Sequence, residues 1–247
     1  MATNSKIEWT QVTWNPVTGC SKVSQGCKYC YAERMAKRLK EMGNKRYLNG
    51  FNVTLHEDLV ELPLRWQQPR IVFVNSMSDL FHEKIPLEFI KRIFDTMERS
   101  PKHVFQILTK RSERLLEVSK ELPWPPNVWM GVSIENVMVL NRVHDLQHVP
   151  AHVRFLSCEP LIEPLNTLPL KGIHWVIVGG ESGPKARPMK KEWVESILQQ
   201  SREAGVAFFF KQWGGVRKDL TGRKLNGQTY NEIPVAKHHS QLNLFLK

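Results

Sequence analysis

Short runs that are apolar at nearly every position limit most strongly what this chain can fold into. The runs IVFV, VFQIL, HWVIV and AFFF are examples. A strand with one face in water alternates apolar and polar residues, whereas a run that is apolar throughout is typical of a strand buried on both faces, as in a parallel sheet covered by helices. Eight strands are predicted, at residues 11–14, 51–55, 71–75, 104–108, 128–132, 153–157, 175–178 and 207–210.

Amphipathic stretches separate these runs and predict helices. They lie at residues 32–42, 86–98, 112–121 and 191–204, with a shorter one at 136–146. Alternating strand and helix units over 247 residues favour an α/β fold, namely a (β/α) barrel of TIM type, complete or incomplete, with a doubly wound open sheet as the alternative. No linker divides the chain, so residues 1–247 are expected to form a single domain that ends in an irregular extension at about 216–247.

The charge balance and the hydropathy bear on partners and compartment. Lys and Arg number 35 and Asp and Glu 24, which gives a net charge of +11 and favours a polyanionic partner, nucleic acid first. No apolar run approaches the ~18 residues that span a bilayer. The first residues, MATNSKIEWTQ, lack the basic and then apolar pattern of a signal peptide. We therefore expect a cytoplasmic monomer with no membrane contact.

The strongest local motif is a cluster of three cysteines, Cys20, Cys27 and Cys30, within eleven positions. A disulfide framework would suit a small exported chain, so clustered thiols here predict a metal site. Three thiolates suit an iron–sulfur cluster or a single divalent ion such as zinc, and they leave one coordination position open for chemistry. The alternative is a closed structural zinc site with His56 or Cys158 as the fourth ligand.

Polar, charged or thiol residues follow each predicted strand. Chemistry gathers at the carboxyl ends of strands in parallel α/β folds, so we expect the site on that rim. The candidates there are His56, Asn75, Lys110, Arg111, Ser133, Glu135, Cys158, Glu159, Glu181, Lys211 and Trp213.

Seven segments together resemble a phage-associated three-cysteine family that is similar to the radical S-adenosylmethionine superfamily. They are TWNPVTGCSKVSQGCKYCYAERMA, MSDLF, LTKR, GVSIEN, EPL, GGESG and FFFKQWG. The resemblance extends from about residue 14 to about residue 214, and the family is distantly similar to spore photoproduct lyase, which reverses ultraviolet damage in DNA. It implies a radical-SAM-like barrel in which the three cysteines hold a [4Fe-4S] cluster and the fourth iron binds S-adenosylmethionine.

Further site roles follow from this resemblance. Asn75, Ser133 and Glu135 are the implied contacts to the methionine and ribose of the cofactor, and Cys158 is the implied hydrogen-atom donor at the barrel mouth. The usual superfamily spacing is C-x3-C-x2-C, whereas six residues separate Cys20 from Cys27. That departure leaves the nature of the metal open, between a cluster and a single ion on three cysteines.

A second mechanism needs no radical. A metal ion with three thiolate ligands and an open position can act as a Lewis acid, with Glu159, Glu181 or His56 as general acid or base. Both mechanisms suit a nucleic-acid substrate, with Lys110, Arg111, Lys185, Arg187 and Lys211 on phosphates and Trp213 stacked on an extruded base.

Three functions are therefore predicted. The first is a metal-dependent DNA repair lyase that reverses an ultraviolet pyrimidine lesion in damaged duplex or single-stranded DNA, served by an electron donor. The second is a radical SAM enzyme that modifies tRNA or a nucleobase. The third is a zinc-stabilised nucleic-acid-binding protein without enzymatic activity.

Overall fold

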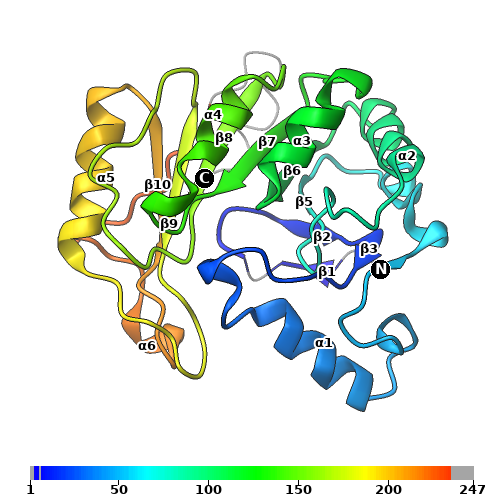
Figure 1. Cartoon of the computed structure of the whole chain (residues 1–247), viewed down its shortest axis with the longest axis horizontal. Helices are drawn as coiled ribbons and strands as arrows, with labels where there is room; N and C mark the ends of the chain where they lie inside the picture. Colours follow the sequence, from blue (N-terminus) through cyan, green and yellow to red (C-terminus); the bar gives the residue numbers. More distant parts are fainter. Residues whose placement is uncertain (1–2, 6, 235–247) are drawn as a thin grey trace.

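The computed structural model describes residues 3–5 and 7–234, and it is built on one curled, eight-stranded sheet (Figure 1). The strand order is β1-β2-β5-β6-β7-β8-β9-β10. Only β1 runs antiparallel to its neighbour, and the other seven strands are parallel. The strands span Thr3–Asn4 (β1), Val12–Trp14 (β2), Ile71–Val74 (β5), Val104–Thr109 (β6), Val128–Ser133 (β7), Val153–Cys158 (β8), Trp175–Gly179 (β9) and Ala207–Gln212 (β10).

The second predicted strand, at residues 51–55, does not join this sheet. Its last two residues form β4 (Thr54–Leu55), which pairs antiparallel with β3 (Val17–Thr18) in a separate two-stranded sheet. The segment FNVTL carries Asn and Thr among its apolar residues, and β4 is only half-buried, so it lacks the two apolar faces that a central parallel strand requires. The sheet therefore stays open between β1 and β10, and the incomplete form of the predicted barrel is confirmed.

The helices lie close to their predicted positions. Five of them span Tyr31–Glu41 (α1), Leu87–Glu98 (α2), Ser112–Val118 (α3), Asn141–Gln147 (α4) and Lys191–Glu203 (α5). A sixth, Lys218–Thr221 (α6), was not predicted and lies in the predicted irregular extension. Short 3₁₀ turns lie at Gln25–Cys27, Lys45–Tyr47, Glu57–Leu59, Leu62–Arg65, Ser119–Glu121 and Val137–Val139. Helices α2 to α5 pack on the convex face of the sheet, whereas α1 lies apart at the bottom of Figure 1.

The two faces of the sheet carry two separate apolar cores. Outward side chains such as Leu156 and Val176 pack under the helices. Inward side chains such as Phe155 and Trp175 fill the concave side, where Trp9 lies 4.6 Å from Phe73 and 6.2 Å from Trp175 between ring centroids. Side chains alternate between faces along a strand, so each run needs apolar residues at successive positions to fill both cores. This is the physical basis of the runs in the sequence.

The segment after β10 returns along that strand. The Phe210 amide donates to the Tyr230 carbonyl at 3.0 Å, and the Trp175 indole donates to the Glu232 carbonyl at 2.8 Å. These contacts cover part of the β10 edge, which would otherwise expose unpaired backbone groups. Residues 235–247 of the predicted C-terminal extension lie outside the described residues.

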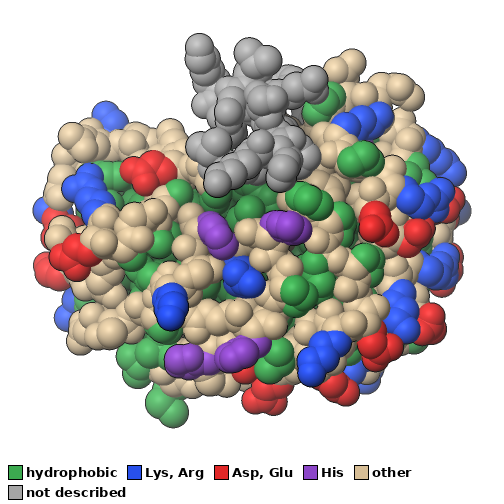
Figure 2. All heavy atoms as spheres, turned by 90° about the horizontal axis from the view of Figure 1, so that it is seen from above, with side chains coloured by type: hydrophobic (Ala, Val, Ile, Leu, Met, Phe, Trp, Pro, Cys, Tyr) green, Lys and Arg blue, Asp and Glu red, His purple; other side chains and the backbone are tan. Residues whose placement is uncertain are grey.

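On the face drawn in Figure 2, basic and acidic side chains stand side by side along the edge where α2 lies. Ion pairs explain this mixture, because Arg92 meets Glu57 at 2.7 Å and Arg99 meets Asp95 at 2.9 Å. In the part of the chain that the structure describes, no helix has the length and apolar character needed to cross a bilayer.

Candidate functional site

Residues 20–30, which carry Cys20, Cys27 and Cys30, are here named the cysteine loop. The loop lies over the carboxyl ends of three strands, because residues that follow β6, β7 and β9 bind it. Arg111 Nη2 donates to Ser21 Oγ at 2.9 Å, Glu135 Oε1 accepts from the Gly26 amide at 3.3 Å, and Arg187 Nη2 donates to the Gln25 carbonyl at 3.0 Å. The loop therefore extends across the opening of the half-barrel at this end, which we name the mouth.

The segments MSDLF and LTKR join beneath the first part of this loop. Asp79 Oδ1 accepts from Thr109 Oγ1 at 2.7 Å, and Asp79 Oδ2 accepts from the Lys110 amide at 3.0 Å and from Arg111 Nη1 at 3.3 Å. This buried carboxylate therefore fixes the direction of the Arg111 side chain.

Arg111 is buried and its donors are used inside the protein. Besides Asp79, it donates to Glu83 Oε2 at 3.0 Å, to the Ser21 carbonyl at 3.2 Å and to Cys20 Sγ at 3.5 Å. The phosphate contact predicted for Arg111 does not agree with this placement. Burial, followed by the charge on Asp79, raises the pKa of the Cys20 thiol to about 11, and Arg111 opposes that rise.

His82 also holds the loop, and the sequence analysis missed it. Its Nε2 lies 2.9 Å from Ser21 Oγ, and its Nδ1 accepts from the Lys84 amide at 3.1 Å. Burial and then Arg111 lower the pKa of His82, so the ring is neutral at pH 7. The one available signal was its position directly after MSDLF.

Glu135 fastens the middle of the cysteine loop. Its Oε1 accepts from Ser24 Oγ and from the Gly26 amide, while its Oε2 accepts from Arg142 Nη1 at 2.9 Å. Glu135 is completely buried and the Arg142 side chain is 6% exposed. A Cβ on Gly26 would lie 2.9 Å from the Glu135 carboxyl, so a larger residue there would displace this carboxylate from its hydrogen bonds. The carboxylate predicted to contact a cofactor is therefore bound to the loop, and Arg142 from α4 is an unpredicted partner.

Glu181 and Arg187 hold the far end of the loop through a two-point ion pair. Arg187 Nη2 lies 2.6 Å from Glu181 Oε1, and Arg187 Nε donates to Oε2 at 2.9 Å. The Arg187 guanidinium also lies 5.6 Å from the centre of the Tyr29 ring. Burial opposes ionisation of Glu181, but the hydrogen bonds from Arg187 lower its pKa overall. Both side chains are thus engaged, and neither the acid–base role of Glu181 nor the phosphate contact of Arg187 agrees with this pairing.

Glu159 and Lys211 form an ion pair inside the mouth. Lys211 Nζ lies 3.0 Å from Glu159 Oε1, and Ser157 Oγ donates to Oε2 at 3.3 Å. Glu159 follows β8 and Lys211 lies in β10, so the pair passes over Gly179 at the end of β9 between them. A Cβ at Gly179 would lie 2.3 Å from Glu159 Oε1. Both side chains keep partial solvent exposure, so this pair can meet a polar ligand.

Two predicted cofactor contacts carry buried polar atoms without a hydrogen-bond partner among the described residues. They are Asn75 Nδ2 and Ser133 Oγ. Asn75 follows β5 with φ of 60°, and its Oδ1 accepts from the Val17 amide at 3.3 Å. Ser133 ends β7. A buried polar group without a partner is costly, so both positions suit hydrogen bonds to a polar ligand at the mouth.

Three other predicted residues do not reach the mouth. Cys158 is buried in the outer core under the helices, because its neighbours Ser157 and Glu159 occupy the inward face of β8. His56 Nε2 is bonded to Thr18 Oγ1 at 2.9 Å. Trp213 packs on Phe210 at 4.8 Å between ring centroids and donates its indole hydrogen to the Lys224 carbonyl. The predicted hydrogen-atom transfer by Cys158 and base stacking by Trp213 are therefore not supported by their positions.

Lys110 and Lys185 remain as predicted phosphate contacts. Lys110 is half-buried at the end of β6, and Lys185 is exposed with φ of 66° in the segment after β9. No salt bridge among the described residues involves either side chain.

The donor set of the cysteine loop fits a thiophilic metal. All three thiols are free and partly buried, and Cys27 lies close enough to Cys20 for its charge to raise the pKa of the Cys20 thiol. Within residues 3–5 and 7–234, no three Cys, His, Asp or Glu side chains converge on one point. The thiols would therefore have to turn toward a common centre when a metal binds.

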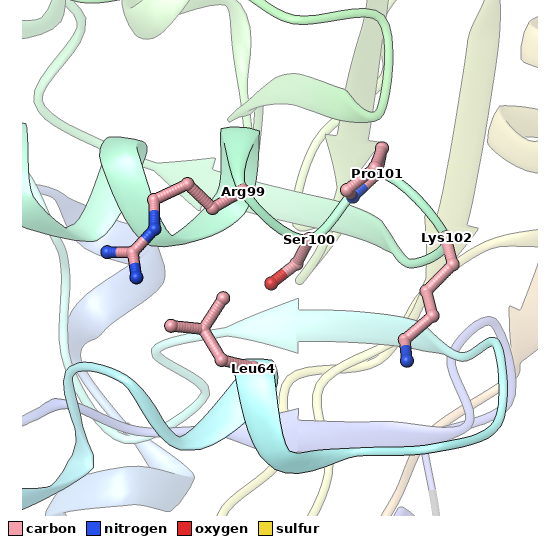
Figure 3. Close-up of a pocket in the computed structure, with 5 residues that line it drawn as sticks. All are labelled: Leu64, Arg99, Ser100, Pro101 and Lys102. Carbon is pink, nitrogen blue, oxygen red and sulfur yellow. The ribbon is translucent and has the colours of Figure 1, made fainter.

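A pocket of about 250 Å³ lies at the opposite, amino end of the sheet (Figure 3). It is lined by Leu64, Arg99, Ser100, Pro101 and Lys102. The Arg99 guanidinium at this pocket is bound to Asp95 and Glu61.

The profile described as "Protein of unknown function (DUF5131)" matches residues 4–234. The chain belongs to the DUF5131 family. No curated protein sequence matches it.

Several solved structures resemble this DUF5131 protein. Spore photoproduct lyase complexed with dinucleoside spore photoproduct is 12% identical, with a TM-score of 0.46 over 82% of this chain. A lyase mutant with bound AdoMet and dinucleoside spore photoproduct is 11% identical with a TM-score of 0.46, and a further mutant is 13% identical with a TM-score of 0.48. The match spans 64% of the length of each of these lyases.

Proposed function

We propose that this DUF5131 protein is a metal-dependent lyase that reverses an ultraviolet pyrimidine lesion in DNA. The observation that carries the proposal is the cysteine loop, with its three free thiols, held over the mouth of a parallel half-barrel by Arg111, Glu135 and Arg187. Placement at the carboxyl ends of the strands is where parallel α/β folds carry their chemistry. The sequence resemblance to the radical SAM superfamily supports the same function.

Cys20, Cys27 and Cys30 would hold a [4Fe-4S] cluster and leave one iron for S-adenosylmethionine. When bound, that pair of cofactors supplies one-electron chemistry that amino-acid side chains cannot perform. Arg111 lies against Cys20 Sγ and favours the thiolate that a metal requires. The alternative is a single ion on the same three thiolates.

The remaining residues at the mouth would bind and orient the cofactor and the substrate. Asn75 Nδ2 and Ser133 Oγ offer hydrogen bonds that nothing else in the described part of the chain uses. The Glu159–Lys211 pair offers one charge of each sign to a ligand with an ammonium and a carboxylate group. Beneath them, the aromatic core around Trp9 and Trp175 closes the half-barrel and keeps water from the lower side.

The net charge of +11 supports a nucleic-acid substrate. A base in a duplex can reach a site at the mouth only after extrusion from the stack. That step costs a few kcal/mol, and less for a poorly stacked lesion, which provides a physical basis for selecting damage.

The test is an anaerobic reconstitution with iron and sulfide, followed by incubation with oligonucleotides that carry a defined ultraviolet lesion. Repair that needs S-adenosylmethionine supports the proposal, and repair without it supports Lewis-acid chemistry at the same site. Lesions that stay unchanged under both conditions would contradict the proposed activity. Modification of tRNA under the same conditions would support the second predicted function instead.

The identity of the bound metal and the metal content of two cysteine variants separate a catalytic metal from a structural one. A structural zinc site needs four protein ligands, and neither His56 nor Cys158 joins the cysteines in the described residues. A colourless protein that holds one zinc ion and shows no turnover would nevertheless support the third predicted function. The matched variants Cys27→Ala and Cys158→Ala then report on the ligand set, because only the first is expected to lose metal.

A further inference from the structure

The exposed face of α1 carries an apolar stripe beside the mouth. Tyr31, Met35, Arg38 and Met42 are spaced i, i+4, i+7 and i+11, so they lie within about 60° of one another around the helix. Tyr31 is 50% exposed, Met35 44% and Met42 69%, although Ala32 and Ala36 on the neighbouring face are buried. These four residues are here named the α1 stripe. Folding leaves it uncovered within the described residues, so it is available to a partner.

Free cations accompany the α1 stripe. Arg38 on the stripe and Lys45 just beyond the helix are exposed, and none of the ion pairs between described residues involves them. This differs from α2, where Arg92 and Arg99 are paired with carboxylates. Arg38 and Lys45 therefore add unpaired basic charge to one apolar strip, which favours a partner that is both anionic and apolar.

The first turn of α1 connects the stripe to the mouth. Tyr31 OH donates to the Ser76 carbonyl after β5, and Arg34 Nη2 donates to the Ser182 carbonyl after β9 at 2.9 Å. Tyr31 also follows Cys30 directly in the chain. Tyr31 thus places the amino end of the α1 stripe directly beside the cysteine loop.

We propose that the α1 stripe is the surface that binds a single-stranded polynucleotide and delivers it to the mouth. Bases present apolar faces that stack on Tyr and Met side chains, and phosphates pair with free Arg and Lys, which is the combination that single-stranded nucleic acid requires. The inference deepens the proposed function and rests on it for the identity of the substrate. Arg111, Arg187 and Lys211 are engaged in internal ion pairs, so the unpaired cations at the α1 stripe are the better placed to bind phosphates.

The test measures binding of fluorescein-labelled 12-nucleotide DNA and RNA single strands of mixed sequence by fluorescence anisotropy. The full-length chain with its metal bound is compared with the variants Met35→Glu/Arg38→Glu and Lys45→Glu. Lys120→Glu is the matched control, because Lys120 is exposed at the amino end of the sheet, far from the mouth. Melting temperatures of all variants check folding.

The expected result is roughly tenfold weaker binding for Met35→Glu/Arg38→Glu and a salt slope that falls by about 0.7 for each phosphate that the variant no longer neutralises. Lys45→Glu should weaken binding less, and Lys120→Glu should match the wild type. A difference between the DNA and RNA arms identifies which polynucleotide the stripe prefers.

Equal affinities for all four proteins, or a wild type that binds neither strand, would overturn the inference. So would a wild-type dimer that Met35→Glu/Arg38→Glu dissociates without an effect on strand binding, because the stripe would then serve a second copy of the chain. The proposed function fails separately, when the stripe binds DNA as expected but ultraviolet lesions remain unchanged.

Discussion

Replacing Glu135 by alanine removes the carboxylate that joins α4 to the cysteine loop. Glu135 is fully buried and its partner Arg142 is nearly so. The variant therefore leaves a guanidinium without its counter-ion in a site closed to water, and it frees the Gly26 amide and Ser24 Oγ. Breaking a buried ion pair on one side costs about 3–5 kcal/mol, which corresponds to a fall of about 6–20 °C in melting temperature for a chain of this size.

Two assays on the metal-free protein measure this effect. Thermal unfolding gives the stability loss, and hydrogen exchange gives the protection of the amides of residues 24–27. We expect both to fall in Glu135→Ala. We expect the double variant Glu135→Ala/Arg142→Ala to lose less than the sum of the two single losses, because it removes both charges together.

Glu83→Ala is the matched control for this experiment. Glu83 is 61% exposed and also pairs with an arginine near the loop, and exposed pairs of this kind contribute about 0–1 kcal/mol. The reasoning is refuted if Glu135→Ala melts within about 2 °C of the wild type, or if exchange in the cysteine loop is unchanged.

Three further predictions concern other parts of the fold. Gly131→Ala should cost at least about 1–3 kcal/mol in chemical unfolding, because a Cβ there would lie 2.4 Å from the Phe155 ring; an unchanged unfolding midpoint would contradict this. Arg187 lowers the pKa of Glu181 from 4.5, so the ion pair stabilises the fold above pH 4.5, and this stabilisation is lost as the pH falls below 4.5. The difference in melting temperature between the wild type and Arg187→Gln should therefore shrink from pH 7 to pH 3.5. Burial lowers the pKa of His103 from 6.5 to about 4, so as the pH falls His103 is protonated in the unfolded chain before it is protonated in the folded protein. The free energy of unfolding should therefore fall by up to about 3 kcal/mol between pH 6.5 and pH 4. His103→Phe should flatten that part of the pH–stability curve, and an unchanged curve would refute this cause.

The strands of the sheet were predictable because burial on both faces leaves a direct mark on composition. IVFV at β5 and AFFF at β10 place apolar side chains in both cores. FNVTL gave a false prediction because a half-buried hairpin strand such as β4 also carries apolar residues. Sequence periodicity does not distinguish a short edge strand from a central one when only two or three positions decide it.

The site was predictable in its location but not in its pairings. Strand ends share one edge of a parallel sheet, and this explains why the cysteine loop meets Glu135 and Arg111. The ion pairs that occupy Arg111 and Lys211 join residues 32 and 52 positions apart, and single-sequence patterns carry no signal for them. The inward or outward direction of Cys158 was readable in principle, because side chains alternate along β8.

Elemental analysis and an absorption spectrum of protein purified without air test the metal site most directly. We expect iron and acid-labile sulfide with a broad visible absorption, absent in Cys27→Ala and kept in Cys158→Ala. Protein that remains colourless after anaerobic reconstitution, or that retains its full metal content when Cys27 is replaced, would contradict a catalytic centre on Cys20, Cys27 and Cys30.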